Sequence, residues 1–166
     1  MSKIKYFLIV LAFIFGGCAA SNEVVKTDQN LEENAKAAVE TAKKDIQDAK
    51  KENAELLAKD SLKDAENILM NAENALKNKD YNGAINNAKQ ASEKANFAKL
   101  ICRATNGVEK AKKDIEEAKN VKAEELSPDL MKSAEDNLML ASDYLSKKDY
   151  AKALEYADKA SENAVE

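Results

Sequence analysis

The chain has 166 residues, of which 45% are apolar, 34% are charged and 5% are aromatic, and it carries no His and no Trp. Few aromatic residues, four Gly and one Pro favour helices, because sheets need β-branched and aromatic side chains and their turns need Gly and Pro. Without His the chain can build no Ser-His-Asp or Cys-His catalytic centre and no His-ligated metal site. We therefore predict a helical protein that is not an enzyme and that uses no cofactor and no metal.

The N-terminal segment has two lysines in its first five residues and then ten apolar residues, 6–15. As a helix this run spans about 15 Å, half of a ~30 Å hydrocarbon core, which is typical of a secretory signal and too short to cross a membrane. Two glycines then precede Cys18. The arrangement resembles the lipobox of bacterial lipoproteins, with Phe15 where that motif usually has Leu. The resemblance implies cleavage between Gly17 and Cys18 and lipid attached to Cys18; an ordinary signal peptide is the alternative.

Cleavage there leaves a signal peptide, 1–17, and a lipidated N-terminus with a flexible tether, 18–30, which lacks an apolar period and reaches up to about 40 Å when extended. The remaining chain has 24 basic and 30 acidic side chains, with Arg103 as its one arginine. This balance disfavours nucleic acid as a partner. By resemblance to the sorting rule of enteric bacteria, Ala19 after the cysteine implies the outer membrane, with the periplasmic or surface face left open.

The body of the chain is an internal duplication. Residues 39–97 align with residues 108–166 without a gap. Of the 59 aligned positions 29 are identical, where chance gives roughly a tenth to a fifth in so biased a composition. We therefore predict two helical repeats, 31–103 and 104–166.

Each repeat carries three stretches in which apolar residues recur every three or four positions, the period of an amphipathic helix. In the first repeat these stretches cover 35–49, 62–76 and 81–95, and in the second repeat they cover 104–118, 131–145 and 150–164. Asp80 and Asp149 stand before the third stretches as predicted N-caps. The connections are short, which favours antiparallel neighbours.

The middle helices also carry predicted start signals. Ser127 is placed to cap its helix, with Pro128 at the first helical position, where the missing N–H has no cost. In the first repeat Ser61 and Asp64 resemble a capping box.

No linker separates the repeats, because the apolar spacing runs on from Asp80 to about Glu125 and weakens only near Gly107. We predict an all-α fold of tandem duplicated antiparallel three-helix bundles, coiled-coil-like, that share one long central helix. A break at Gly107 that folds the repeats against each other is the alternative.

The apolar stripes along which the predicted helices pack, here called the helix seams, are rich in alanine. Alanine supplies 28 of the 149 residues after the predicted cleavage site. Alanine lets helices approach closely but contributes about 0.8 kcal/mol when buried, against about 1.5–3 for Leu or Ile. We therefore expect no deep cavity and no small-molecule substrate. Cys102 follows the apolar period of its helix, which favours a small buried hydrophobe over a reactive thiol.

Two substitutions distinguish the second repeat from the first. Tyr144 replaces Ala75 and Tyr156 replaces Asn87, and both tyrosines lie beside the predicted seam. Because aromatic side chains are favoured at interface hot spots, Tyr144 and Tyr156 are the candidate partner patch. The alternative is that they cover the end or a groove edge of the bundle.

The second repeat also resembles a known family. The segment Ser-Pro-Asp-Leu-x-Lys-Ser-Ala-Glu-x-Asn-Leu from Ser127, followed by a Lys-Asp-Tyr corner and a ladder of alanines, is similar to an uncharacterised family of short Ala-rich helical bacterial lipoproteins. In that family the domain is often found beside OmpA-like peptidoglycan-binding domains. Here Lys148 stands where the family often has Gly, and Lys59 replaces the proline in the first repeat. The corner also resembles, more weakly, half of a tetratricopeptide motif.

These features predict a non-enzymatic, lipid-anchored cell-envelope protein that acts as a helical structural or protein-interaction module, with an envelope protein or peptidoglycan as its partner. A surface-exposed adhesin or antigen that binds host or matrix molecules is the alternative, since location alone separates the two. A membrane-active amphipathic helix is disfavoured because the apolar seams are narrow and matched to each other. The carboxylates are scattered along solvated faces, which disfavours an enzyme. The sequence has no calcium-loop motif, which disfavours a calcium site.

Overall fold

The fold comes from a computed structural model that describes residues 19–166, with side chains from residue 29 onward. Its helices are α1 (Ala19–Lys51), α2 (Ala54–Leu57), α3 (Lys59–Lys77), α4 (Tyr81–Asn120), α5 (Ala123–Leu126), α6 (Pro128–Ser146) and α7 (Tyr150–Val165). The described residues contain no strand, so the predicted all-α class is confirmed. In this part of the chain, none of the helices has the length and apolar character needed to cross a membrane. The predicted signal peptide and Cys18 lie outside the described residues.

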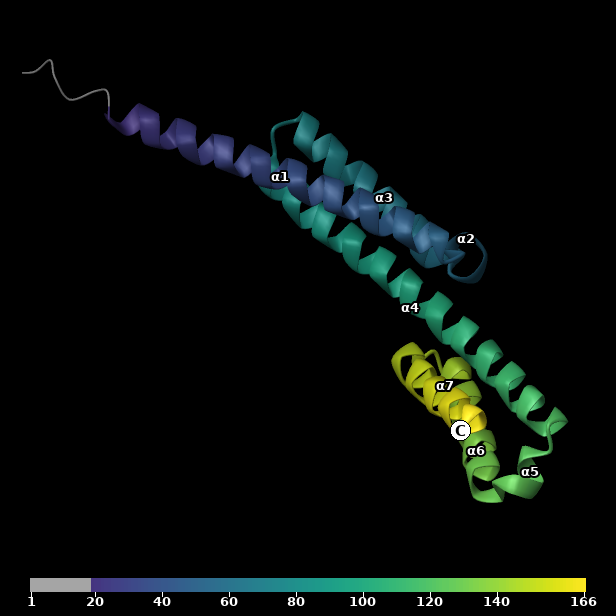
Figure 1. Cartoon of the computed structure of the whole chain (residues 1–166). Helices are drawn as coiled ribbons and strands as arrows, with labels where there is room; N and C mark the ends of the chain where they lie inside the picture. Colours follow the sequence, from purple (N-terminus) through teal and green to yellow (C-terminus); the bar gives the residue numbers. More distant parts are fainter. Residues whose placement is uncertain (1–18) are drawn as a thin grey trace, which may run out of the picture.

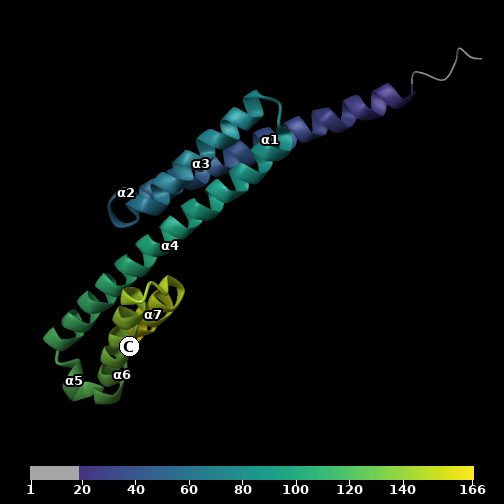
Figure 2. The ribbon, with the colours of Figure 1, turned by 180° about the vertical axis from the view of Figure 1, so that it is seen from behind.

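Two three-helix bundles share α4, as predicted (Figure 1). The first half of α4 packs with α1 and α3, and its second half packs with α6 and α7. Within the described helices, no Cα atom of α1, α2 or α3 lies within 8 Å of one in α5, α6 or α7. The bundles therefore lie at opposite ends of α4, as the view from behind also shows (Figure 2), and the folded-back arrangement does not occur.

The duplication extends to the backbone. The helices α5, α6 and α7 begin at the positions that the sequence alignment pairs with the first residues of α2, α3 and α4. Residues with left-handed backbone also come in matching pairs, Asn53 with Lys122 and Lys79 with Lys148. Both copies thus use the same turns, including the one-turn helix between the first and middle helices.

The predicted caps are confirmed in part. The carboxylates of Asp80 and Asp149 each accept a hydrogen bond from the backbone N–H three residues on, at 2.9 and 3.3 Å. Ser127 stands directly before α6, but its hydroxyl makes no capping hydrogen bond. The Ser61 prediction is wrong: the chain passes from α2 into α3 through a single residue, so α3 begins at Lys59 and Ser61 lies in its first turn.

The buried face of α4 changes sides along the helix. Its buried residues are Ala84, Ala88, Ala91, Ala95, Ala98 and Cys102 in the first part, and Ala104, Val108, Ala111, Ile115 and Ala118 in the second. The step from Cys102 to Ala104 is two residues, which turns the buried face by about 200°. The two bundles accordingly pack on opposite sides of α4 (Figure 1). The continuous apolar spacing predicted from the sequence does not include this shift.

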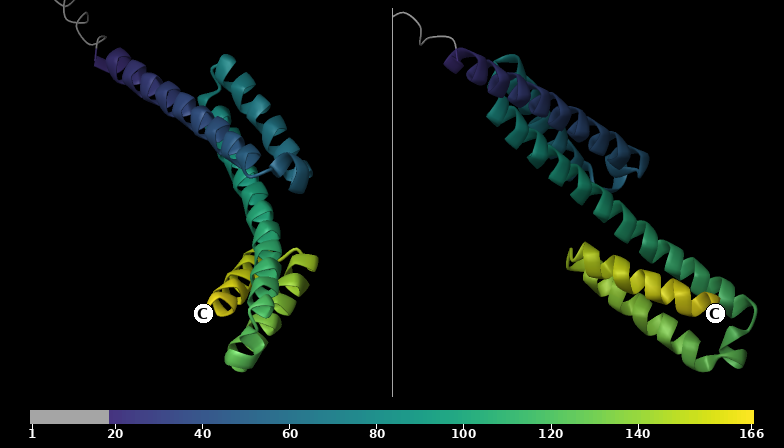
Figure 3. Two further views of the ribbon diagram at one scale, coloured as in Figure 1. Left: turned by 45° about the vertical axis from the view of Figure 1, so that its right-hand side comes forward. Right: turned by 60° about the vertical axis from the view of Figure 1, so that its left-hand side comes forward.

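The glycine in α4 does not break the helix. In the second bundle Gly107 takes the place that Ala38 has in the first, and Leu154 takes the place of Ile85. A Cβ at Gly107 would lie 3.1 Å from the Cδ1 atom of Leu154, so the glycine leaves room for the longer side chain. The helix α4 curves along its length and continues through this contact (Figure 3).

The helix α1 differs from the expected flexible tether, because it already begins at Ala19. Residues 19–30 contain no Gly and no Pro to interrupt a helix. This segment projects beyond the first bundle, where it has no neighbouring helix, which accounts for its missing apolar period (Figure 1). As a helix it covers about 18 Å, against about 40 Å for an extended chain.

We expect the alanine seams to tolerate no larger side chain. Ala157 is fully buried in α7 and faces Gly107, whereas Ala151 in the same helix is exposed. Ala157→Leu should therefore lower the free energy of unfolding by about 1–3 kcal/mol through overpacking, and Ala151→Leu should change it by less than about 0.5 kcal/mol. Urea unfolding followed by circular dichroism measures both, and equal effects would contradict the packing described.

Candidate functional site

The two tyrosines of the predicted partner patch lie together between α6 and α7. Their ring centroids are 5.4 Å apart and the ring planes are inclined by only 9°, so Tyr144 and Tyr156 stack. Both side chains are half-buried, and Tyr156 packs against the core of the second bundle. The two rings thus cover the edge of the groove between α6 and α7. A role in partner binding stays a prediction.

Two lysines of α7 complete this cluster. The Nζ atom of Lys152 lies 5.0 Å from the ring centroid of Tyr144, and that of Lys159 lies 4.9 Å from the centroid of Tyr156, both within the range of cation–π attraction. Each lysine also pairs with a carboxylate three or four residues earlier in the chain, at 3.4 and 2.7 Å. These carboxylates are the main reason that the pKa of both ammonium groups is raised. Each tyrosine ring thus already has a ring and a cation for neighbours.

Sequence reasoning missed the lysines, although a signal was present. In the first repeat their positions hold Gly83 and Gln90, just as the tyrosine positions hold Ala75 and Asn87. Four linked differences therefore separate the copies at one place. The cluster belongs to the second bundle alone, and it offers a partner ring edges, hydroxyl groups and two ammonium groups.

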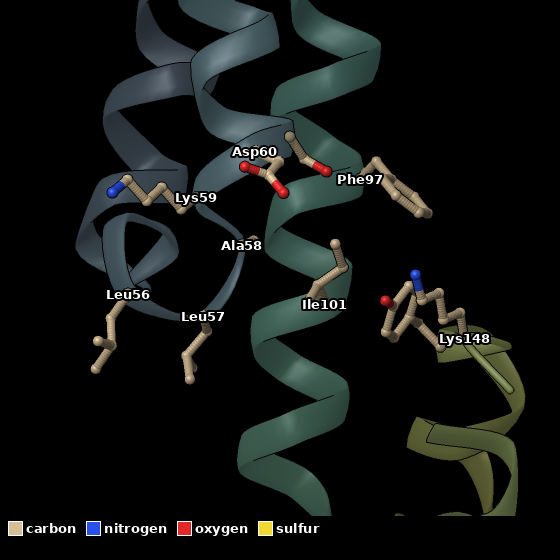
Figure 4. A pocket seen from close by; sticks show the side chains of 10 residues that line it. Leu56, Leu57, Ala58, Lys59, Asp60, Phe97, Ile101 and Lys148 are labelled. Carbon is tan, nitrogen blue, oxygen red and sulfur yellow. The ribbon is translucent and has the colours of Figure 1, made fainter. Parts of the chain in front are cut away.

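A second surface lies at the junction of the bundles, where a groove of about 470 Å³ opens to solvent. Leu56 and Leu57 of α2 line one side, Phe97 and Ile101 of α4 line the floor, and Lys148 faces them from the turn before α7 (Figure 4). Leu56 is 82% exposed and Phe97 is 45% exposed. Both bundles contribute to this groove, so it exists only while they keep their positions along α4.

The apolar floor of this junction groove has no equivalent at the start of the first bundle. Phe97 and Ile101 stand where α1 has Asp28 and Glu32 in the alignment of the repeats. In the first bundle the hydroxyl of Tyr81 lies 3.1 Å from a carboxylate oxygen of Glu32. Its counterpart Tyr150 instead meets the edge of Phe97, with ring centroids 5.6 Å apart at 73°. The junction has thus exchanged a polar contact for an aromatic one.

The Cys102 thiol and the paired carboxylates have structural roles in the described residues. Cys102 is fully buried among alanines of the first bundle, and this burial raises the pKa of its thiol. Among the described residues no three metal-ligating side chains gather. The pKa values of Glu32, Asp48 and Glu52 are lowered, mainly by hydrogen bonds from neighbouring Lys or Arg side chains. These carboxylates are held ionised, which is the opposite of what a general acid needs.

Comparison of the chain with protein-family models, with curated proteins and with solved structures finds no match in any of the three. Its function is therefore inferred from its own residues and their geometry.

We expect the tyrosine pair to stabilise the second bundle. Tyr156→Ala should lower the free energy of unfolding by about 1–3 kcal/mol, because a half-buried ring and its stacking partner are lost. Asn87→Ala, the same position in the first bundle, should have an effect of less than about 0.5 kcal/mol. A double-mutant cycle with Tyr144→Ala should give a coupling energy of about 0.5–1.5 kcal/mol in urea unfolding. Additive effects would show that the rings do not interact.

Proposed function

We propose that this chain is a non-enzymatic, lipid-anchored protein of the bacterial cell envelope that acts as a helical structural and protein-interaction module. The observation that carries the proposal is the position of the predicted lipid attachment site. Cys18 directly precedes α1, which leads into a rod whose central helix has 40 residues. A helix of that length spans about 60 Å. Lipid at Cys18 would therefore hold the rod at one end and leave both bundles clear of the membrane.

The anchor itself rests on the leader, whose apolar run is too short to cross a membrane and ends before Cys18. Ala19 after the cysteine supports the outer membrane, again by resemblance to the sorting rule of enteric bacteria. The surface-exposed adhesin differs from this proposal in location alone. Protease digestion of intact cells distinguishes them, because only a surface-exposed rod is cut before the cells are lysed.

The interaction role is supported by the junction groove. Its volume is open to solvent, and its lining combines apolar side chains with Lys59, Asp60, Ser61 and Lys148. Exposed Leu56 and Phe97 suit the apolar side chains of a polypeptide, because contiguous exposed apolar surface typically marks a protein interface. We therefore favour an envelope protein over peptidoglycan as the partner. The alanine-rich core offers little space to enclose a small substrate.

The anchor is tested by Cys18→Ala in cells. In this variant the chain should stay unprocessed and incorporate no labelled palmitate, because it has no acceptor for lipid. Cys102→Ala is the matched control and should be processed and labelled normally, since the Cys102 thiol is buried. Normal processing and labelling of Cys18→Ala would contradict lipid attachment at this residue.

The groove is tested by placing a photo-crosslinking amino acid at position 97 in cells. Light should join the chain to an envelope protein, and adding Leu56→Glu should reduce the product several-fold by placing a charge in the apolar lining. The same amino acid at Lys44, an exposed residue of α1, is the control and should give no such product. Identical products from both positions, or none from position 97, would contradict a role of this groove.

A further inference from the structure

Each bundle has a corner where its first helix turns through a one-turn helix into its middle helix. We call residues 52–58 the first corner and residues 121–127 the second corner. In the first corner Ala54 is fully buried and Leu57 packs against the core. The cover is supplied by α4, whose Ala98 and Cys102 are both fully buried in the same cluster. A helix with small residues four positions apart therefore lies on the first corner.

The second corner has the same backbone, but no described segment covers it in this way. The helix α4 packs on α2, whereas among the described residues no Cα atom of α7, which corresponds to the start of α4, lies within 8 Å of one in α5. Leu126, the counterpart of Leu57, is 80% exposed, and Ala123, the counterpart of buried Ala54, is only half-buried. Figure 3 shows this corner, around α5, at the end of the molecule far from α1.

The second corner has also changed its chemistry. In the first corner Glu52 receives two hydrogen bonds from the Arg103 guanidinium, at 2.9 and 2.6 Å, which fasten α4 to the corner. Val121 stands in the place of Glu52 and is 71% exposed. A surface that only faced water would gain nothing from this exchange, because an exposed valine adds apolar surface where the first repeat has a carboxylate.

The charged residues around the second corner are already paired with one another. The Nζ atom of Lys122 lies 3.6 Å from the Oε1 atom of Glu125, and the Nζ atom of Lys119 lies 3.8 Å from the Oε1 atom of Glu124. Such exposed ion pairs contribute little, so we assign recognition at this corner to the apolar Val121 and Leu126.

We propose that the second corner is a docking site for an α-helix of another protein, seated as residues 98–103 of α4 are seated on the first corner. The first corner defines the chemistry of this helix. It carries small residues four positions apart, in the places of Ala98 and Cys102, so that its backbone approaches closely. In the place of Arg103 it carries an apolar residue, which covers Val121.

A second copy of this chain does not fit the site. Its own Ala98 and Cys102 are already buried in its first bundle. The corresponding segment of α1 has Gln29 and Glu33 in the places of Ala98 and Cys102. Packing Glu33 against the apolar corner would bury a carboxylate without a partner, which is strongly unfavourable. We therefore assign the site to a helix of a different protein, and this inference depends on neither the lipid anchor nor the junction groove.

The test uses a labelled helical peptide with the sequence of residues 92–106 that carries Cys102→Ala and Arg103→Leu, titrated against the purified full chain by fluorescence anisotropy. We expect saturable binding that weakens at least about tenfold in Leu126→Glu. The control is Met70→Glu, at an exposed apolar residue of α3, which should leave the affinity within about twofold. Leu126 and Met70 are both exposed, so neither variant should unfold.

A second measurement compares the affinities of two peptides that differ only at position 103. The peptide that keeps Arg103 should bind several-fold more weakly than the Leu peptide, because Val121 stands in the place of the carboxylate of Glu52 that receives this guanidinium in the first corner. In the variant Val121→Glu, which restores the residue of the first corner, this preference should reverse. The proposal is overturned if no saturation is seen, if Leu126→Glu leaves binding unchanged, or if Val121→Glu leaves the preference as it was. Sedimentation that shows a dimer lost in Leu126→Glu would also overturn it, in favour of a second copy.

Discussion

The whole structure depends on α4 presenting two buried faces on opposite sides of one uninterrupted helix. Alanine makes this arrangement feasible, because its small side chain lets neighbouring helix axes come close on either side. The face changes between Cys102 and Ala104, where two closely spaced small residues allow both bundles to pack without an intervening loop. The geometry of α4 therefore fixes where the two bundles lie. The positions of the two buried faces along α4 determine how far apart the bundles are.

This geometry determines which apolar side chains remain exposed to solvent. At the change of face, Phe97 and Ile101 belong fully to neither core and line the junction groove. At the far end, the second corner has no following helix over it among the described residues. In a tandem repeat neighbouring units cover one another, and within residues 19–166 the second corner has no such neighbour. Both candidate protein-binding surfaces thus follow from how the repeats are joined.

The sequence predicted the duplication, the helix seams and the Asp80 and Asp149 caps, because each leaves a local pattern of identity or spacing. It did not reveal the change of face in α4, since one shortened step is hidden among many alternating steps of three and four. Nor did it reveal that α1 begins at Ala19, because an unpartnered helix needs no apolar period. The tyrosine pair was predicted from its difference between copies, but the lysines beside it required the register of α7 against α6. Contacts between helices depend on such registers, which no single segment encodes.

The two bundles differ in what holds their corners. Arg103 and the buried Ala98 and Cys102 fasten the first corner, and they lie in the part of α4 that follows residue 97, where the aligned copy ends. The second bundle replaces part of this support with the stacked Tyr144 and Tyr156, which act between α6 and α7 and do not reach α5. Stabilisation is therefore concentrated away from the second corner, and its end should open more readily than the rest of the rod. A helix docked on that corner would supply the contact that the first bundle already has within the chain.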